Sequence, residues 1–117
     1  MDTLTRLERS ALNASFNDLA EELLSLRIQA ENAMVKSREI SSAGSFVNIY
    51  VDEKSPVIDN KSQIIISNTY GKSSIIEHSL GINVFIENGT INCLELYSFD
   101  EDWLQFDHNS EYKFYKY

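Results

Sequence analysis

Proline, glycine and cysteine are scarce in this sequence. One proline and four glycines among 117 residues leave no composition for a flexible linker or a low-complexity tail, and no internal repeat is present. We therefore expect a single domain over residues 1–117. The one cysteine, Cys93, cannot form an internal disulfide, and its position in an apolar run predicts a buried thiol without a redox role.

Long apolar runs are also missing. The first ten residues lack a basic start followed by an apolar segment, and no run approaches the length that spans a bilayer. These absences predict a cytoplasmic protein without membrane contact.

Basic residues are outnumbered, ten to eighteen, which gives a net charge of -8. Residues 87–117 carry seven acids and two bases, so the last quarter is the acidic part. Such a field repels phosphate backbones, which argues against nucleic-acid binding, and attracts a basic protein. Acidity that merely keeps the protein in solution is the alternative.

The N-terminal third has the pattern of an amphipathic helix. Apolar residues from Leu12 to Ala33 recur in steps of four and three. Ser15 followed by Asp18 has the form of a capping box, so one helix is predicted to start near Ser15 after a shorter helix over residues 3–13. One long helix is the alternative, and the spacing does not decide between them.

The remainder alternates with a period of two. Strands are predicted over residues 35–40, 46–51, 64–66 and 82–86 and from residue 90 to Phe99, with a tight hairpin turn at Asn88-Gly89. The fold class is therefore α+β: N-terminal helices, about residues 3–34, packed on an antiparallel meander of four or five strands, about residues 35–117.

Glu95 lies among apolar neighbours on the last predicted strand, which has apolar residues on both faces. A carboxylate buried without a partner is unfavourable. The pattern favours a structural ion pair with Arg27 or Arg38, and contact with a partner or ligand is the alternative.

Catalytic and metal-binding patterns are weak. The two histidines, His78 and His108, fit turn or loop positions better than a general base, and no phosphate-binding glycine motif is present. Asp100, Asp102, Asp107 and His108 lack the spacing of a calcium loop. No enzyme activity, cofactor or metal is predicted.

The C-terminal segment interleaves acids with aromatic residues, which is the composition of a protein-binding patch. Residues 100–103 follow a strand end and are predicted to be exposed. For residues 112–117, a final strand packed on the sheet and a contact surface are equally compatible with the pattern. The predicted partner-binding residues are Asp100, Glu101, Asp102, Trp103, Asp107 and Glu95.

Several stretches, in order, resemble a family of small, mostly uncharacterised bacterial proteins. Its members read roughly LRxQ, SREFTGVGFF, LxHGAGFxLFV and DGxLxxLEGYTYDExWP. The corresponding stretches here are LRIQ (26–29), SREI (37–40), GSF (44–46), EHSLG (77–81), FIENG (85–89) and LELYSFDEDW (94–103).

Small acidic bacterial proteins of this build also look like the immunity proteins of contact-dependent growth inhibition and related polymorphic toxin systems. The resemblance implies a cytoplasmic protein that binds a cognate toxin domain, commonly a basic nuclease, and blocks it. The alternative hypothesis is a housekeeping domain that binds a small ligand, with His78, Arg38 and Glu95 converging on one pocket.

Overall fold

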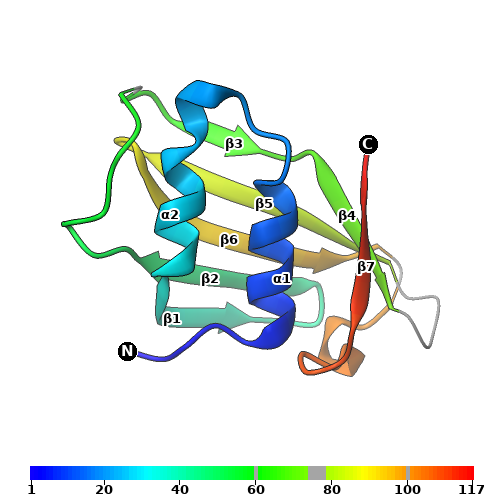
Figure 1. The fold of residues 1–117 in the computed structure, drawn as a ribbon. Helices are drawn as coiled ribbons and strands as arrows, with labels where there is room; N and C mark the ends of the chain where they lie inside the picture. The colour runs from blue at the N-terminus through cyan, green and yellow to red at the C-terminus, as the bar shows by residue number, and fades with distance from the viewer. Residues whose placement is uncertain (60, 74–78, 100) are drawn as a thin grey trace.

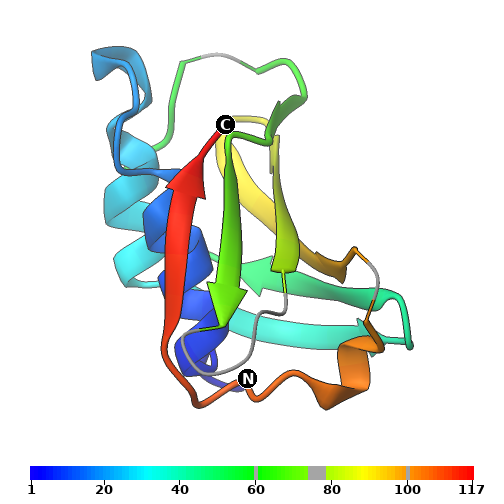
Figure 2. The ribbon, with the colours of Figure 1, turned by 90° about the vertical axis from the view of Figure 1, so that its right-hand side faces the viewer.

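Two helices lie side by side on one face of an antiparallel sheet. The computed structural model describes residues 1–59, 61–73, 79–99 and 101–117. Helices α1 (Arg6–Ser15) and α2 (Ser25–Glu31) lie in front of the sheet in Figure 1, and Figure 2 shows both on the same side of it. This arrangement confirms the predicted α+β fold. Within the described residues, no helix has both the length and the apolar character needed to cross a membrane.

The sheet contains seven strands among the described residues, in the order β1-β2-β6-β5-β4-β7 with β3 also beside β5. Every strand pair is antiparallel. Their bounds are β1 (Met34–Ile40), β2 (Gly44–Tyr50), β3 (Ile64–Ile66), β4 (Thr69–Ser73), β5 (Ser79–Glu87), β6 (Thr90–Ser98) and β7 (Tyr112–Lys116). The sheet is larger than the expected four or five strands because β4 and β7 also join it.

Helix α1 begins at a capping box formed by Thr5 and Glu8, not at the one predicted at Ser15. The Thr5 side chain accepts from the backbone N–H of Glu8 at 3.1 Å, and the Glu8 carboxylate accepts from the Thr5 N–H at 2.8 Å. Ser15 is instead the last residue of α1, and its hydroxyl donates to the Ala11 carbonyl at 3.0 Å. The helix start predicted at Ser15 is therefore wrong.

The predicted second helix is shorter than the apolar pattern suggested. A single 3₁₀ turn, η1 (Glu21–Leu23), precedes α2. Helix α2 buries Leu26, Gln29 and Ala30 against the sheet. The chain therefore forms two short helices, not one long one.

The Asn88-Gly89 turn is confirmed, since both residues have positive φ, 52° and 79°. Gln29 of α2 ties this turn to the helix layer. Its side-chain amide donates to the carbonyls of Gly89 and Pro56 at 3.0 and 2.8 Å and accepts from the Ile91 N–H at 2.9 Å. One buried glutamine thus links α2, the loop after β2 and the β5–β6 hairpin.

Replacing Gln29 with leucine is expected to lower the free energy of unfolding by about 1–3 kcal/mol, because the buried Ile91 N–H loses its acceptor. Urea denaturation measures the change. Gln105→Leu is the matched control, since Gln105 is exposed and its replacement should shift stability by less than about 0.5 kcal/mol. Equal effects at the two positions would contradict the linking role of Gln29.

Candidate functional site

Both described helices cover one face of the sheet, and no described helix covers the other face. Side chains alternate along β2 and β6, so Val47, Leu94 and Leu96 are buried beneath the helices, while Phe46 and Glu95 point to the other side. We call this second side the open face. Its outward side chains, taken from the strand registers, include the acids Glu39 and Glu95, the aromatic residues Phe46, Tyr70, Phe85, Tyr97 and Tyr115, and also Asn48, Asn83, Cys93, Lys72 and Lys113.

Tyr97 is the central aromatic residue of the open face. It pairs with Gly44 of β2 on one side and Gly81 of β5 on the other. A Cβ atom at Gly81 would overlap the Tyr97 ring, so the ring lies directly over this glycine. Phe99 packs edge-on against Tyr97, with ring centroids 5.6 Å apart. Gly81 thus leaves the space that the Tyr97 ring occupies, and Gly44 permits the close approach of the β6 backbone at Leu96 and Tyr97.

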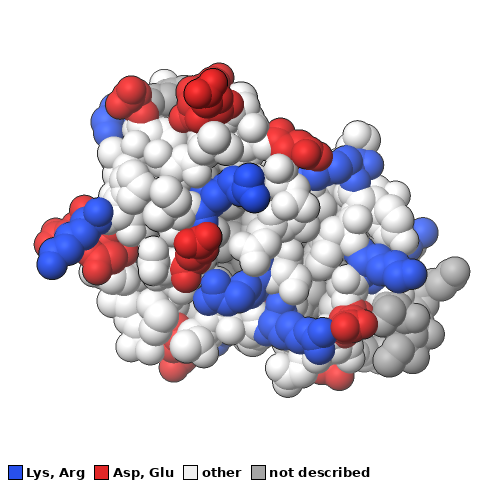
Figure 3. Space-filling view, viewed as in Figure 1, with Lys and Arg blue, Asp and Glu red and all other residues white. Residues whose placement is uncertain are grey.

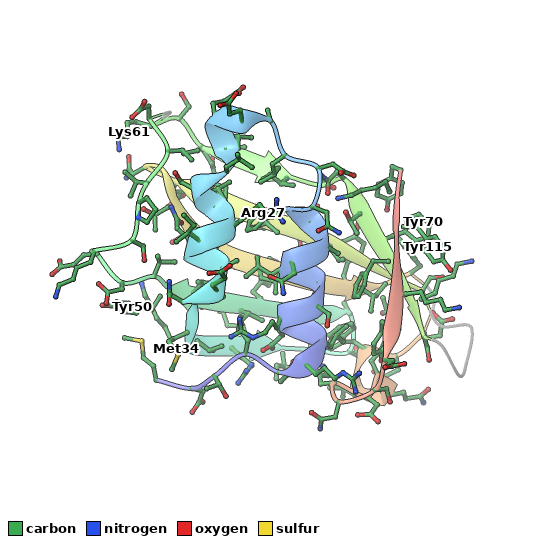
Figure 4. All side chains as sticks on the ribbon, viewed as in Figure 1. Arg27, Met34, Tyr50, Lys61, Tyr70 and Tyr115 are labelled. Carbon is green, nitrogen blue, oxygen red and sulfur yellow. The ribbon has the colours of Figure 1, made fainter. Side chains whose placement is uncertain are left out.

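Further aromatic residues continue this surface toward β7. Tyr70 pairs with Gly81 and with Tyr115 in the strand registers. The Tyr70 ring stacks on Tyr115 at 5.4 Å between centroids and contacts Tyr117 at 5.2 Å. Figure 4 shows Tyr70 and Tyr115 next to each other at the β4–β7 edge. Because Tyr115 and Tyr117 are exposed, this edge presents aromatic surface to solvent.

A pocket of about 250 Å³ opens on the same face, between the β1–β2 hairpin and β6. Its walls include Glu39, Phe46, Glu95 and Tyr97. Burial, together with the nearby Glu95 and Glu39 carboxylates, raises the pKa of the neighbouring Cys93 thiol to about 11. Burial also raises the pKa of Tyr97, with Tyr117 and Glu95 contributing. The pocket therefore combines aromatic walls with a negative field. We call it the open-face pocket.

Glu95 has a different environment from the one predicted. It is half-buried on the open face, and its carboxylate accepts from the Asn83 side-chain amide at 2.9 Å. Arg38 and Arg27 lie on the helix-covered side, and Figure 4 places Arg27 between the two helices. The expected ion pair between Glu95 and either arginine is therefore wrong. The hypothesis that Arg38 and Glu95 converge on one pocket fails for the same reason, and His78 lies outside the described residues.

The buried carboxylate of this protein is Glu8. Its side chain is fully buried, and Arg38 donates to both of its oxygens at 2.8 Å. Burial alone would raise the pKa of Glu8, but the hydrogen bonds from Arg38 and from the Thr5 N–H outweigh it and lower that pKa. His108 lies beside this pair, with Nδ1 3.3 Å from the Thr5 hydroxyl, and burial lowers its pKa. The cluster joins α1 to β1 and to the C-terminal segment.

The segment after β6 turns Trp103 into the molecule. Trp103 begins a short 3₁₀ turn, η2 (Trp103–Gln105), and is 1% exposed. Its backbone N–H donates to the Ser42 carbonyl at 2.8 Å, and its ring stacks on Phe106 with centroids 4.9 Å apart. The predicted exposure of Trp103 is therefore wrong. Leu104, its neighbour, is 65% exposed.

Two acids of this segment, Asp102 and Asp107, lie at the surface and also shape its turns. Asp102 is exposed and accepts from the Leu104 N–H at 3.0 Å. Asp107 is exposed and accepts from the Asn109 N–H and the Ser110 hydroxyl at 2.9 and 2.7 Å, and these hydrogen bonds lower its pKa. Glu101 is half-buried, and Asp100 lies outside the described residues.

For residues 112–117, the interpretation as a final strand packed on the sheet is confirmed for part of the side chains, and the interpretation as a contact surface stays a prediction. They form β7, which pairs with β4, and the half-buried Tyr112 and Phe114 pack on the core. Tyr115 and Tyr117 are exposed instead.

Sequence reasoning missed Glu39 and Phe46 as site residues. The available signal was the presence of apolar groups on both faces of β6, together with Gly44 and Gly81 opposite Tyr97. That pattern predicts a central strand, and β6 does lie between β2 and β5, although among the described residues no helix covers one of its two faces.

The helix-covered side differs from the open face in its charge. Figure 3 shows acidic and basic groups interspersed over it, without one dominant sign. Within the part of the chain that the structure describes, no group of three or more His, Cys, Asp or Glu side chains is placed to hold a metal ion. The open face therefore carries the strongest candidate site. Comparison with models of protein families, with curated proteins and with solved structures finds no match for this chain.

Proposed function

We propose that this chain is an immunity protein, which binds a cognate toxin domain in the cytoplasm and neutralises it by protein–protein contact. The observation that carries the proposal is the open face, where exposed Phe46, Phe99 and Tyr115 lie on the same surface as the Glu39 and Glu95 carboxylates. Aromatic anchors with polar surroundings are typical of protein interfaces. The net charge of -8 favours a basic partner such as a nuclease domain.

The predicted partner-binding residues take different parts in this proposal. Glu95 belongs to the open face. The acids Glu101, Asp102 and Asp107 supply negative charge at the C-terminal segment, and the sequence adds the charge of Asp100 to the same segment. Their charges attract a basic partner over a distance and speed association. Trp103 supports the segment from inside, since it is 1% exposed.

The electrostatic part is tested with the toxin domain encoded immediately upstream, if the gene has such a neighbour. Asp102→Asn combined with Asp107→Asn removes two charges, and asparagine preserves both turn-capping hydrogen bonds. Association measured by stopped flow at low salt is expected to slow about threefold, with a flatter salt dependence.

Asp52→Asn combined with Glu53→Gln is the matched control. It removes the same charge from the loop after β2, and Asp52 forms the same kind of turn bond, to the Lys54 N–H at 2.9 Å. The control should associate at the normal rate. If both double variants slow association equally, the total charge of the protein and not the position of the acids causes the effect. Failure of the two proteins to form a complex would refute the proposed function.

Small-ligand binding is the second candidate. A surface pocket of about 430 Å³ lies between α2, β1 and the loop after β2. Met34 and Tyr50, which are register partners and appear together in Figure 4, line it with Pro56. This volume falls in the range of ligand pockets. A rise in melting temperature with a metabolite, without any protein partner, would favour this candidate.

A further inference from the structure

We propose that the open-face pocket receives an arginine side chain of the protein partner, with the guanidinium group against Phe46 and between Glu39 and Glu95. The inference deepens the proposed function, because it names the chemical group that the partner must present at this site. It stands on the position of the two carboxylates, the exposed ring between them and the absence of a basic residue among the pocket walls.

The strand register places the three side chains in one row. Glu39 of β1 pairs with Phe46 of β2, and Phe46 pairs with Glu95 of β6. Directly paired residues point to the same face of a sheet, so the carboxylates lie on either side of the Phe46 ring. Strand spacing puts the Cα atoms of the two acids about 10 Å apart. A side chain entering between them can reach both.

The ring of Phe46 is accessible, since the residue is 43% exposed. Tyr97 forms a further wall of the pocket and is held over Gly81, so this wall is built before any partner arrives. A flat cation is attracted to the face of an aromatic ring. The pocket therefore offers a stacking surface and two acceptors at once.

The described residues supply no counter-ion to the two carboxylates of the pocket. Among the residues that the structure describes, neither Glu39 nor Glu95 forms a salt bridge. Asn83 occupies one oxygen of Glu95 and orients the carboxylate without changing its charge. Burial is the main cause of the raised pKa of the nearby Cys93 thiol, and the contribution of both acids is consistent with a negative field beside the pocket.

Arginine fits these features better than lysine. Its guanidinium group is planar, donates in several directions and stacks on aromatic rings, whereas the lysine ammonium is a compact and strongly hydrated charge. Bidentate contact with a carboxylate adds strength that a single ammonium contact lacks. The geometry thus selects a guanidinium group held between two acids and over a ring.

The probe is the capped peptide acetyl-Gly-Arg-Gly-amide, titrated into the ¹⁵N-labelled protein and followed by amide chemical shifts. The expected result is a saturable shift confined to residues around Glu39, Phe46, Glu95 and Tyr97. The citrulline peptide, which has nearly the same shape without the charge, should bind at least about tenfold more weakly.

Glu39→Gln and Glu95→Gln should each weaken the arginine peptide by about tenfold, and Phe46→Leu should weaken it by about threefold. Glutamine at position 95 can still accept from Asn83, so the fold around the pocket is maintained. Glu53→Gln is the control, because it removes one charge from an exposed loop position outside the pocket, and its affinity should be unchanged.

Two results would overturn the inference. One is a set of chemical-shift changes spread evenly over all acidic surfaces. The other is equal affinity for the arginine peptide and for the same peptide with lysine or citrulline in place of arginine. A free protein that sediments as a dimer through the open face would do the same, since a second copy would then occupy the pocket. If a toxin complex forms and is insensitive to Glu39→Gln and Glu95→Gln, the inference fails and the proposed function stands. If the peptide binds as expected and no toxin complex forms, the pocket stands and the proposed function fails.

Discussion

Replacement of Arg38 with methionine is expected to lower the free energy of unfolding by about 3–5 kcal/mol at neutral pH. Glu8 is fully buried, and Arg38 donates to both of its carboxylate oxygens at 2.8 Å. The substitution leaves a buried charge with only the Thr5 N–H as a hydrogen-bond partner. Methionine retains much of the length of the arginine stem. The decrease in the free energy of unfolding therefore comes mainly from the missing guanidinium group and less from lost packing.

The pH dependence of this difference gives a sharper test. Arg38 holds the pKa of Glu8 below its ordinary value of 4.5, so the stability contributed by the pair is present above pH 4.5 and is lost as the pH falls through the lowered folded pKa. In Arg38→Met, burial acts without the arginine and the carboxyl can bind a proton. The stability difference between wild type and variant should therefore shrink below pH 4.5 in urea titrations.

Arg6→Met provides the matched control. Arg6 pairs with Glu111 at 2.9 Å, but both side chains are largely exposed, 55% and 73%. Exposed pairs contribute about 0–1 kcal/mol. The double variant Glu8→Gln, Arg38→Met should be less destabilised than the sum of its single variants, since no unpaired charge remains. Loss of less than about 1 kcal/mol in Arg38→Met would refute the buried-pair interpretation.

In the N-terminal helical third, the local sequence pattern predicts which residues are buried but not where the helices begin. The apolar steps correctly identified buried positions such as Leu12, Phe16 and Leu26. The helix boundary was wrong because two segments have the same local capping pattern, Thr5 with Glu8 and Ser15 with Asp18. What separates them is not local: Glu8 gains Arg38 from β1 as a partner, 30 residues away. Sequence spacing alone does not contain that contact.

In the sheet as well, features set by neighbouring residues could be predicted, and features set by residues far apart in the chain could not. The Asn88-Gly89 hairpin was predictable because a two-residue turn with positive φ sets its own register. Strand β4 was missed because its sequence, TYGKS, has no run of alternating apolar residues. It is held instead by β5 and by β7, and the pairing of Thr69 with Lys116 joins residues far apart in the chain.

The candidate site depended on knowing which face of the sheet the helices cover. Alternation places Glu95 opposite Leu94 and Leu96, but it does not say which side remains open. Once the helices are placed, Arg38 and Glu95 fall on different sides, and the open face becomes visible as a site. Within the quoted stretches, Gln29 and Trp103 are buried and hydrogen-bonded within this fold, so these two residues serve its structure.

Trp103→Ala is expected to lower the free energy of unfolding by about 3–5 kcal/mol, the other large effect. The side chain is 1% exposed and packs against Phe106 and His108, with ring centroids 4.9 and 5.3 Å away. Truncation leaves a cavity where the C-terminal segment meets the rest of the fold. Urea denaturation measures the loss, and Leu104→Ala, at a position 65% exposed, should change stability by less than about 0.5 kcal/mol.

A second measurement separates a scaffold residue from a contact residue. Trp103→Phe keeps an aromatic ring in the core and should remain folded, so affinity for a partner can be measured per folded molecule. A scaffold role predicts that Trp103→Phe binds the partner with unchanged affinity. Reduced affinity is then expected only for variants of exposed residues such as Leu104→Ala. Reduced affinity of Trp103→Phe with unchanged stability would restore Trp103 to the contact surface, and the segment would then have to turn outward on binding. The buried position of the ring makes the first outcome the expected one, because exposing it would cost the packing that holds η2 in place.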